Sequence, residues 1–161
     1  MYATGSLVLW TRRGSGVDVD AGWQALATDR VRRISIANPE HAPYGRAAVA
    51  ALRRAGFYER LQPKLVLGEN VGQAAQFVQS GNADAGLLPL ALARSEALAR
   101  VGEYVVIPAT LYPPIEQAAV VLRGSTNKEA ARAFLAYLQR ADVAAMLAEA
   151  GFGPAPVRSR K

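Results

Sequence analysis

The feature that most constrains the fold of this chain is a repeated alternation of short apolar runs with amphipathic helical segments. Residues 33–37 alternate in polarity and predict a strand, and residues 45–55 then place apolar side chains at helical spacing before Gly56 ends the helix. The same order, a strand and then a helix, follows at residues 64–67 and 71–80. This alternation is typical of an α/β fold, in which right-handed crossovers join parallel strands.

The other apolar runs continue this pattern and then give way to helices. A strand without polar residues is predicted at residues 85–88, which is typical of a sheet covered on both faces. Other strands are predicted at residues 6–10, 104–107 and 117–122, and helices at residues 128–138 and 142–150, the second one capped by Asp142. We therefore expect an α/β lobe with hinge segments at both ends over residues 1–122, C-terminal helices over residues 123–153 and a basic tail over residues 154–161.

The composition excludes several classes of protein. Of the 161 residues, 51% are hydrophobic and 20% are charged, which is too apolar for a disordered chain. The chain has no cysteine, so disulfides, thiolate catalysis and iron–sulfur clusters are excluded. His41 is the single histidine, and no nucleophile accompanies it in a catalytic motif. We therefore do not expect an enzyme, and we interpret His41 as a residue that positions its loop.

The net charge of +6 raises the question of a nucleic-acid partner. Arg158, Arg160 and Lys161, at the end of the tail, supply three of the cations, and the rest are scattered. We therefore expect a solvated surface and no nucleic-acid partner. The alternative function is a small basic nucleic-acid-binding module that uses the tail, whose affinity would fall steeply with salt.

Two loops follow neighbouring predicted strands, at residues 38–44 and 68–70. Both would leave the carboxyl edge of a parallel sheet, where ligands bind in such folds. Each leads into a helix whose first N–H groups lack a partner within the helix, and where the peptide dipoles leave about half a positive charge. Gly45 allows a ligand to approach the backbone, and Asn70 is a favourable N-cap, with Gln73 completing a capping box. The two loops thus predict an anion site built from backbone amides.

Sequence motifs around these loops resemble a known family. They read YATGSLVLW at residues 2–10, IANPEHAPYG at 36–45, KLVLGENVGQAA at 64–75, SGNADAG at 80–86 and AEAGF at 148–152. In this order, over most of the chain, they resemble the molybdate-binding periplasmic proteins of ABC-type importers. The resemblance implies an α/β fold of the type II periplasmic-binding-protein class, represented mainly by its second lobe with C-terminal return helices.

The resemblance also implies a ligand and the donors that hold it. Molybdate or tungstate would be held by neutral hydrogen-bond donors, and the second-lobe donors would be the backbone N–H groups of Tyr44 and Val71. Gly45 and Asn70 lie in the same two turns. Molybdenum would enter only as the oxyanion, with no cofactor, and sulfate stays open because the choice depends on cavity size. The implied partner is the membrane permease of the importer, and the implied location is periplasmic, although the chain shows no signal peptide.

The chain departs from the family pattern in two places. Pro89 stands where some members carry a tyrosine hydroxyl, and nothing before Tyr2 corresponds to the first-lobe segments that complete the oxyanion cage. Losing two or three charge-assisted hydrogen bonds would cost roughly 3–9 kcal/mol, so we expect an incomplete fragment with weak affinity. The return helices would then expose Phe134, Tyr137 and Met146, an apolar surface that promotes self-association.

Overall fold

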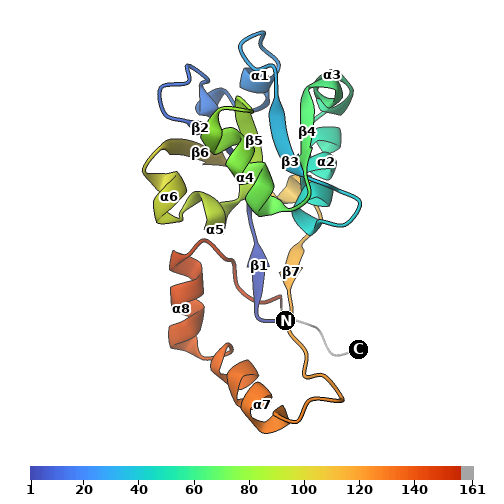
Figure 1. Ribbon diagram of the computed structural model, residues 1–161, viewed down its shortest axis with the longest axis vertical. Helices are drawn as coiled ribbons and strands as arrows, with labels where there is room; N and C mark the ends of the chain where they lie inside the picture. Colours follow the sequence, from blue (N-terminus) through green and yellow to red (C-terminus); the bar gives the residue numbers. More distant parts are fainter. Residues whose placement is uncertain (157–161) are drawn as a thin grey trace.

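The computed structural model describes residues 1–156, and its centre is a five-stranded sheet (Figure 1). The strand order is β4 (Leu65–Gly68), β3 (Ile34–Ala37), β5 (Ala85–Pro89), β2 (Leu7–Arg12) and β6 (Gly102–Val106). Strands β4, β3 and β5 are parallel, and β2 runs antiparallel to both of its neighbours. The α/β class is therefore confirmed, with one strand of opposite direction in the middle of the sheet.

Two long helices cover opposite faces of this sheet. Helix α2 (Pro43–Arg54) packs on the face that contains Leu7 and Leu9, and helix α4 (Val71–Ser80) packs on the face that contains Val8 and Trp10. Successive side chains of a strand point to opposite faces, so β2 contributes to both cores in turn. This explains why β2 is buried from Leu7 to Thr11 and why its first four residues are a continuous apolar run.

Short elements complete the body. They are the α-helices α1 (Trp23–Leu26), α3 (Tyr58–Leu61), α5 (Leu90–Ala93) and α6 (Glu96–Ala99) and the 3₁₀ helices Val19–Ala21, Gln62–Lys64 and Ala109–Leu111. The carboxylate of Asp84 accepts hydrogen bonds from the backbone amides of Arg32 and Arg33, at 2.8 and 2.9 Å. It thereby fixes the start of β3 beside the start of β5.

A second, two-stranded sheet joins the body to the C-terminal segment, and we call it the hinge ribbon. It pairs β1 (Ala3–Gly5) antiparallel with β7 (Ile115–Gln117), and Gly153 returns to bond Thr4 on the other side of β1. The prediction of a strand over residues 117–122 is wrong beyond Gln117, because β7 ends there and residues 118–122 pair with no strand among residues 1–156. An apolar run alone does not supply the ladder hydrogen bonds that define a strand.

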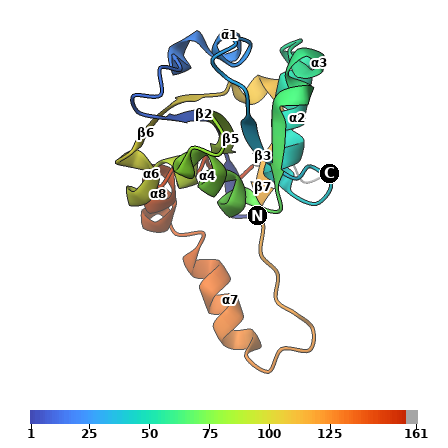
Figure 2. The ribbon, with the colours of Figure 1, turned by 45° about the horizontal axis from the view of Figure 1, so that its top comes forward.

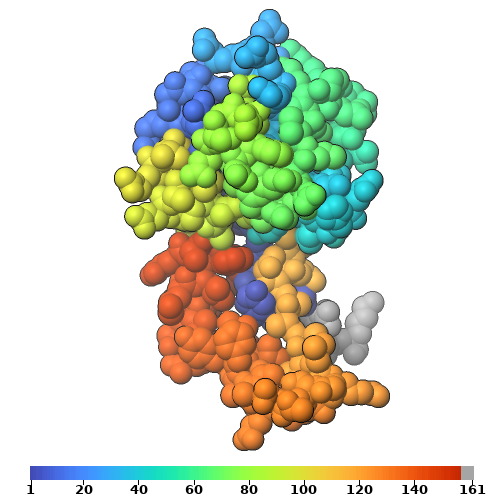
Figure 3. All heavy atoms as spheres, viewed as in Figure 1, coloured from blue at the N-terminus to red at the C-terminus, as the bar shows by residue number. Residues whose placement is uncertain are grey.

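Helix α8 lies beside the hinge ribbon, with its end against the body, and α7 lies farther from the sheet, beyond the ribbon (Figures 1 and 2). Helix α7 (Lys128–Tyr137) buries none of its residues, and helix α8 (Ala141–Glu149) buries only Val143. The guanidinium of Arg94, on the body, donates to the last carbonyls of α8, those of Ala148 and Glu149, at 3.2 and 3.0 Å. In the space-filling view this helical segment extends from one end of the body (Figure 3).

The helix boundaries differ from the sequence predictions at two N-termini. Helix α2 begins at Pro43, two residues early, because proline is favoured in the first helical turn. The prediction that Asp142 caps α8 is wrong, because Arg140 occupies the N-cap position. Asp142 lies in the first turn of the helix, and its carboxylate forms an ion pair with the guanidinium of Arg140 at 2.7 Å. Within residues 1–156, no helix has the length and apolar character needed to cross a bilayer.

Candidate functional site

The two loops that the sequence singled out lie side by side at one edge of the sheet. Strands β3 and β4 pair in register up to Ala37 and Gly68, and the amide of Asn38 donates to the carbonyl of Gly68 at 2.7 Å. Further along the first loop, the ring of His41 approaches the second loop, with its Nε2 atom 3.0 Å from the carbonyl oxygen of Glu69. This contact agrees with the interpretation of His41 as a positioning residue, a role that stays a prediction, and it links the two loops.

The first turn of α2 carries two backbone donors without an internal acceptor. Its N-cap is Ala42, whose methyl group provides no capping hydrogen bond, and Pro43 has no N–H to donate. Among the described residues, the amides of Tyr44 and Gly45 have no hydrogen-bond acceptor. A Cβ atom on Gly45 would overlap the carbonyl oxygen of Ala37, so only glycine lets the helix begin this close to the end of β3.

The first turn of α4 is capped by side chains but, among residues 1–156, leaves the amides of Val71 and Gly72 without an acceptor. The Oδ1 atom of Asn70 accepts from the amide of Gln73 at 3.0 Å, which confirms the predicted cap. The Gln73 side chain completes the box by accepting from the amide of Glu69, not from that of Asn70 as in the standard motif, at 2.6 Å. The amide of Val71 has no acceptor among residues 1–156.

The electrostatics of this edge favour a small anion held by main-chain groups. Both helices are long enough to carry a full dipole, with 12 residues in α2 and 10 in α4, and they start from adjacent strands. Backbone N–H groups donate hydrogen bonds and cannot accept them, and they do not ionise near neutral pH, so the arrangement suits a fully ionised oxyanion. All four sequence-predicted residues, Tyr44, Gly45, Asn70 and Val71, lie in these two first turns.

The side chain of Tyr44 adds a feature that the sequence did not reveal. It is half-buried and reaches the hinge ribbon, where a Cβ atom on Gly5 would overlap its hydroxyl oxygen. Burial, with Tyr112 and Tyr2 close by, raises the pKa of Tyr44 to about 12. Tyr44 and Gly5 are 39 positions apart, and no periodicity links them, so only the folded arrangement shows this contact.

The chain also matches a known protein family. The family model for bacterial extracellular solute-binding proteins matches residues 1–153. The chain belongs to that family. The molybdate-binding protein ModA of Rhodobacter capsulatus is 38% identical to this solute-binding protein over 152 residues, which are 94% of this chain and 58% of the relative. The ModA protein of Azotobacter vinelandii is also 38% identical, over 94% of this chain and 60% of its own length.

Solved structures of solute-binding proteins match this fold. The periplasmic molybdate-binding protein of Azotobacter vinelandii superposes with a TM-score of 0.82 at 35% identity, covering 94% of this chain and 65% of that one. The substrate-binding domain of a molybdenum ABC transporter from Clostridium difficile, described as putative, gives 0.76 at 26% identity, over 96% of this chain and 66% of that one. The chain thus spans about three fifths of the length of the curated relatives it matches. The periplasmic-binding-protein fold expected from the motifs is confirmed. Nothing in these relatives supports the alternative of a nucleic-acid-binding module. The tail residues 158–161 on which that alternative depends lie outside the part of the chain that the structure describes.

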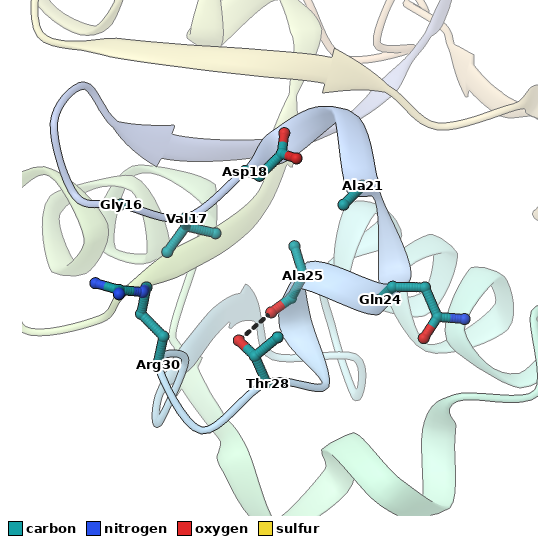
Figure 4. Close-up of a pocket in the computed structure, with 8 residues that line it drawn as sticks. All are labelled: Gly16, Val17, Asp18, Ala21, Gln24, Ala25, Thr28 and Arg30. Atoms are coloured by element: carbon teal, nitrogen blue, oxygen red, sulfur yellow. Dashed lines mark hydrogen bonds between the residues drawn. The ribbon is translucent and has the colours of Figure 1, made fainter.

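A pocket of about 250 Å³ in this solute-binding protein lies at the other edge of the sheet (Figure 4). It follows the end of β2, where Thr11 pairs with the first residue of β5, and its lining is mainly apolar. Asp18 and Arg30 are its charged residues, and the hydroxyl of Thr28 donates to the carbonyl of Ala25 at 2.7 Å. It is remote from both helix N-termini, so we do not include it in the oxyanion site.

Proposed function

We propose that this chain binds molybdate or tungstate through the backbone amides of Tyr44 and Val71. The observation that supports this is the pair of unsatisfied helix N-termini on adjacent parallel strands, tied together by the His41 contact. Gly45 supplies a further free amide, and Asn70 contributes by holding the first turn of α4. The ModA relatives, named for molybdate binding, support the same ligand.

The donor set explains why a fully ionised oxyanion is the expected ligand. A ligand that still carries a proton would direct an O–H donor at N–H donors, and no acceptor would satisfy it. Molybdate, tungstate and sulfate avoid this conflict, whereas hydrogen phosphate does not. The preference for molybdate or tungstate over sulfate rests on the relatives, because size selection needs donors on every side of the ligand.

The biological role that we propose is delivery of the oxyanion to an importer. Members of a solute-binding family bind their ligand without transforming it, so the proposal includes no catalysis and no cofactor. The membrane permease of an ABC-type importer would be the partner. The location would be the periplasm, because the similar molybdate-binding protein of Azotobacter vinelandii is periplasmic. The division into a lobe at residues 1–122, helices at 123–153 and a tail at 154–161 stays a prediction.

The affinity of this chain alone is expected to be weak. The described donors approach the ligand from one side, and each charge-assisted hydrogen bond contributes about 1.5–3 kcal/mol. Isothermal titration calorimetry with molybdate, tungstate, sulfate and phosphate measures this affinity directly. We expect molybdate and tungstate to bind with dissociation constants in the micromolar range or weaker, which corresponds to a binding free energy no more favourable than about −8 kcal/mol. We expect no measurable binding of hydrogen phosphate.

A proline substitution tests the amide of Val71 without removing the helix. Val71 is the first residue of α4, a position where proline is well tolerated and where its missing N–H costs no helical bond. Val71→Pro should lower the affinity for molybdate about tenfold, because it deletes one donor to a charged ligand. Ala141→Pro, at the first residue of α8, is the matched control and should bind as the wild type does. Wild-type affinity in Val71→Pro, with an unchanged unfolding midpoint, would contradict the proposed site.

A further inference from the structure

Helices α2 and α4 fix their first turns by different means. Helix α4 has a cap within its own sequence, since Asn70 accepts from the amide of Gln73. Helix α2 has alanine at the same position, and replacing a polar N-cap with alanine typically costs about 1 kcal/mol of helix stability. A first turn without a cap frays unless a contact from elsewhere in the fold holds it. The candidate donors of α2 lie in that turn, so something else must hold them in place.

The contact that holds this turn comes from the hinge ribbon. The phenol of Tyr44 lies against Gly5 so closely that a Cβ atom there would overlap the hydroxyl oxygen and lie 2.8 Å from Cζ. Gly5 is the residue of β1 that pairs with Ile115 of β7, so the phenol sits against the ribbon at the point where its two strands pair. Glycine at position 5 is therefore a steric requirement of the Tyr44 side chain.

A second tyrosine fixes the next residues of the same segment. The amide of Leu7 donates to the hydroxyl oxygen of Tyr112 at 3.0 Å, and the carbonyl of Ser6 accepts from the amide of Leu90 at 2.8 Å. Leu7 pairs with Pro89, the last residue of β5, so the ribbon leaves the sheet at the same edge as the two loops. The Tyr44 ring thus reaches across this edge from the first turn of α2 to Gly5, the residue before the Ser6–Leu7 segment that these two hydrogen bonds hold.

We propose that Tyr44 is a positioning residue, whose phenol, seated on Gly5 of the hinge ribbon, orients the backbone donors at the start of α2. The backbone amide of Tyr44 is a candidate donor, and the side chain of the same residue contacts the ribbon at Gly5. Movement of the ribbon against the body is therefore transmitted to the amides of Tyr44 and Gly45. The expected change in ligand affinity rests on the proposed function. The expected change at the start of α2 rests only on the contact between Tyr44 and Gly5.

A double-mutant cycle between positions 5 and 44 tests this role. The variants are Gly5→Ala, Tyr44→Ala, the double variant and Tyr44→Phe, which keeps the ring. Gly124→Ala is the matched control, because a Cβ atom on Gly124 meets nothing within 4 Å. The readouts are the molybdate dissociation constant by calorimetry and the amide chemical shift of Gly45 without ligand, with the unfolding midpoint by circular dichroism as a check on folding.

We expect Gly5→Ala and Tyr44→Ala each to weaken molybdate binding at least fivefold and to shift the Gly45 amide. Combining them should add little to either single change, whereas Gly124→Ala should match the wild type and Tyr44→Phe should keep most of the affinity. Independent, multiplicative effects of the two substitutions would overturn the positioning role. Absence of oxyanion binding by the wild-type chain would overturn the proposed function instead. A Gly45 amide shift that is the same in the wild type and Gly5→Ala would overturn the contact itself, whether or not ligand binds.

Discussion

The Nε2 atom of His41 lies 3.0 Å from the carbonyl oxygen of Glu69, so one side chain joins the loops that start α2 and α4. Strand pairing brings the loops to the same edge, but it ends at Ala37 and Gly68. Beyond those residues, the hydrogen bond of Asn38 and the His41 contact hold the two helix N-termini in a fixed relation. The candidate donors are therefore arranged before any ligand arrives.

We expect His41→Ala to weaken molybdate binding several-fold with a small loss of stability. A hydrogen bond of this kind contributes about 0.5–1.5 kcal/mol, and its loss would let the two loops move apart. His41→Gln, which retains a donor on a side chain of similar length, should recover part of the affinity. Calorimetry and urea unfolding measure the two effects. Equal affinities in His41→Ala and the wild type would show that the loops need no cross-link.

The raised pKa of Tyr44 predicts a loss of stability in strong alkali. In the unfolded chain this phenol ionises near its ordinary value of 10.0, whereas in the folded protein its pKa is about 12. Between these values the folded state retains a proton that the unfolded state has lost, so the free energy of unfolding falls as pH rises. Below about pH 10 this group causes no pH dependence, because both states are neutral.

Tyr44→Phe isolates this effect from that of the other tyrosines. The variant should lose stability less steeply than the wild type between pH 10 and 12, and the two should follow parallel curves at lower pH. Urea unfolding midpoints measured from pH 8 to 12 give the comparison. Identical pH profiles for the two proteins would mean that the phenol is as well solvated in the folded chain as in the unfolded one.

A new cap on α2 should raise stability and lower affinity. Ala42 has the extended backbone of an N-cap residue, with φ −102° and ψ 122°, but lacks a side-chain acceptor. In Ala42→Ser the hydroxyl oxygen would accept from the amide of Gly45, adding about 1 kcal/mol of stability and removing that amide from the ligand site. Thermal unfolding and calorimetry follow the two quantities.

A cap added elsewhere serves as the control for that experiment. Arg140→Ser places serine at the N-cap of α8, which also lacks a side-chain capping bond and lies on the C-terminal segment. It should leave the affinity for molybdate unchanged. A rise in stability without any loss of affinity in Ala42→Ser would show that the Gly45 amide does not face the ligand.

The exposed face of the C-terminal helices predicts self-association. Phe134 and Met146 are 58% and 61% exposed, and the rings of Phe134 and Tyr137 lie side by side on α7 with centroids 6.4 Å apart. This confirms the exposure expected from the sequence, and the association itself stays a prediction. Sedimentation velocity should show a mass that rises with protein concentration, and Phe134→Glu should lower it. A monomer at every concentration would contradict this expectation.

Much of the site could be read from local sequence signals. Capping residues act within one helical turn, so Asn70 and Gln73 predict the start of α4 correctly. The start of α2 is predicted at Gly45, two residues late, because the sequence pattern assigns Pro43 to the loop although proline is favoured in the first helical turn. The capping box still differs in detail, because Gln73 bonds the amide of Glu69. The strand predicted at residues 117–122 fails for a different reason, since a strand exists only with a partner.

The sequence by itself determined the alternation of strands and helices and the capped start of α4, because these depend on neighbours within a few positions. The tertiary structure alone decided that β2 runs antiparallel between β5 and β6, that His41 reaches Glu69, and that the Tyr44 ring rests on Gly5. The physical reason is that the two side-chain contacts join residues 28 and 39 positions apart, and strand pairing and packing against the hinge ribbon, not local propensity, bring them together.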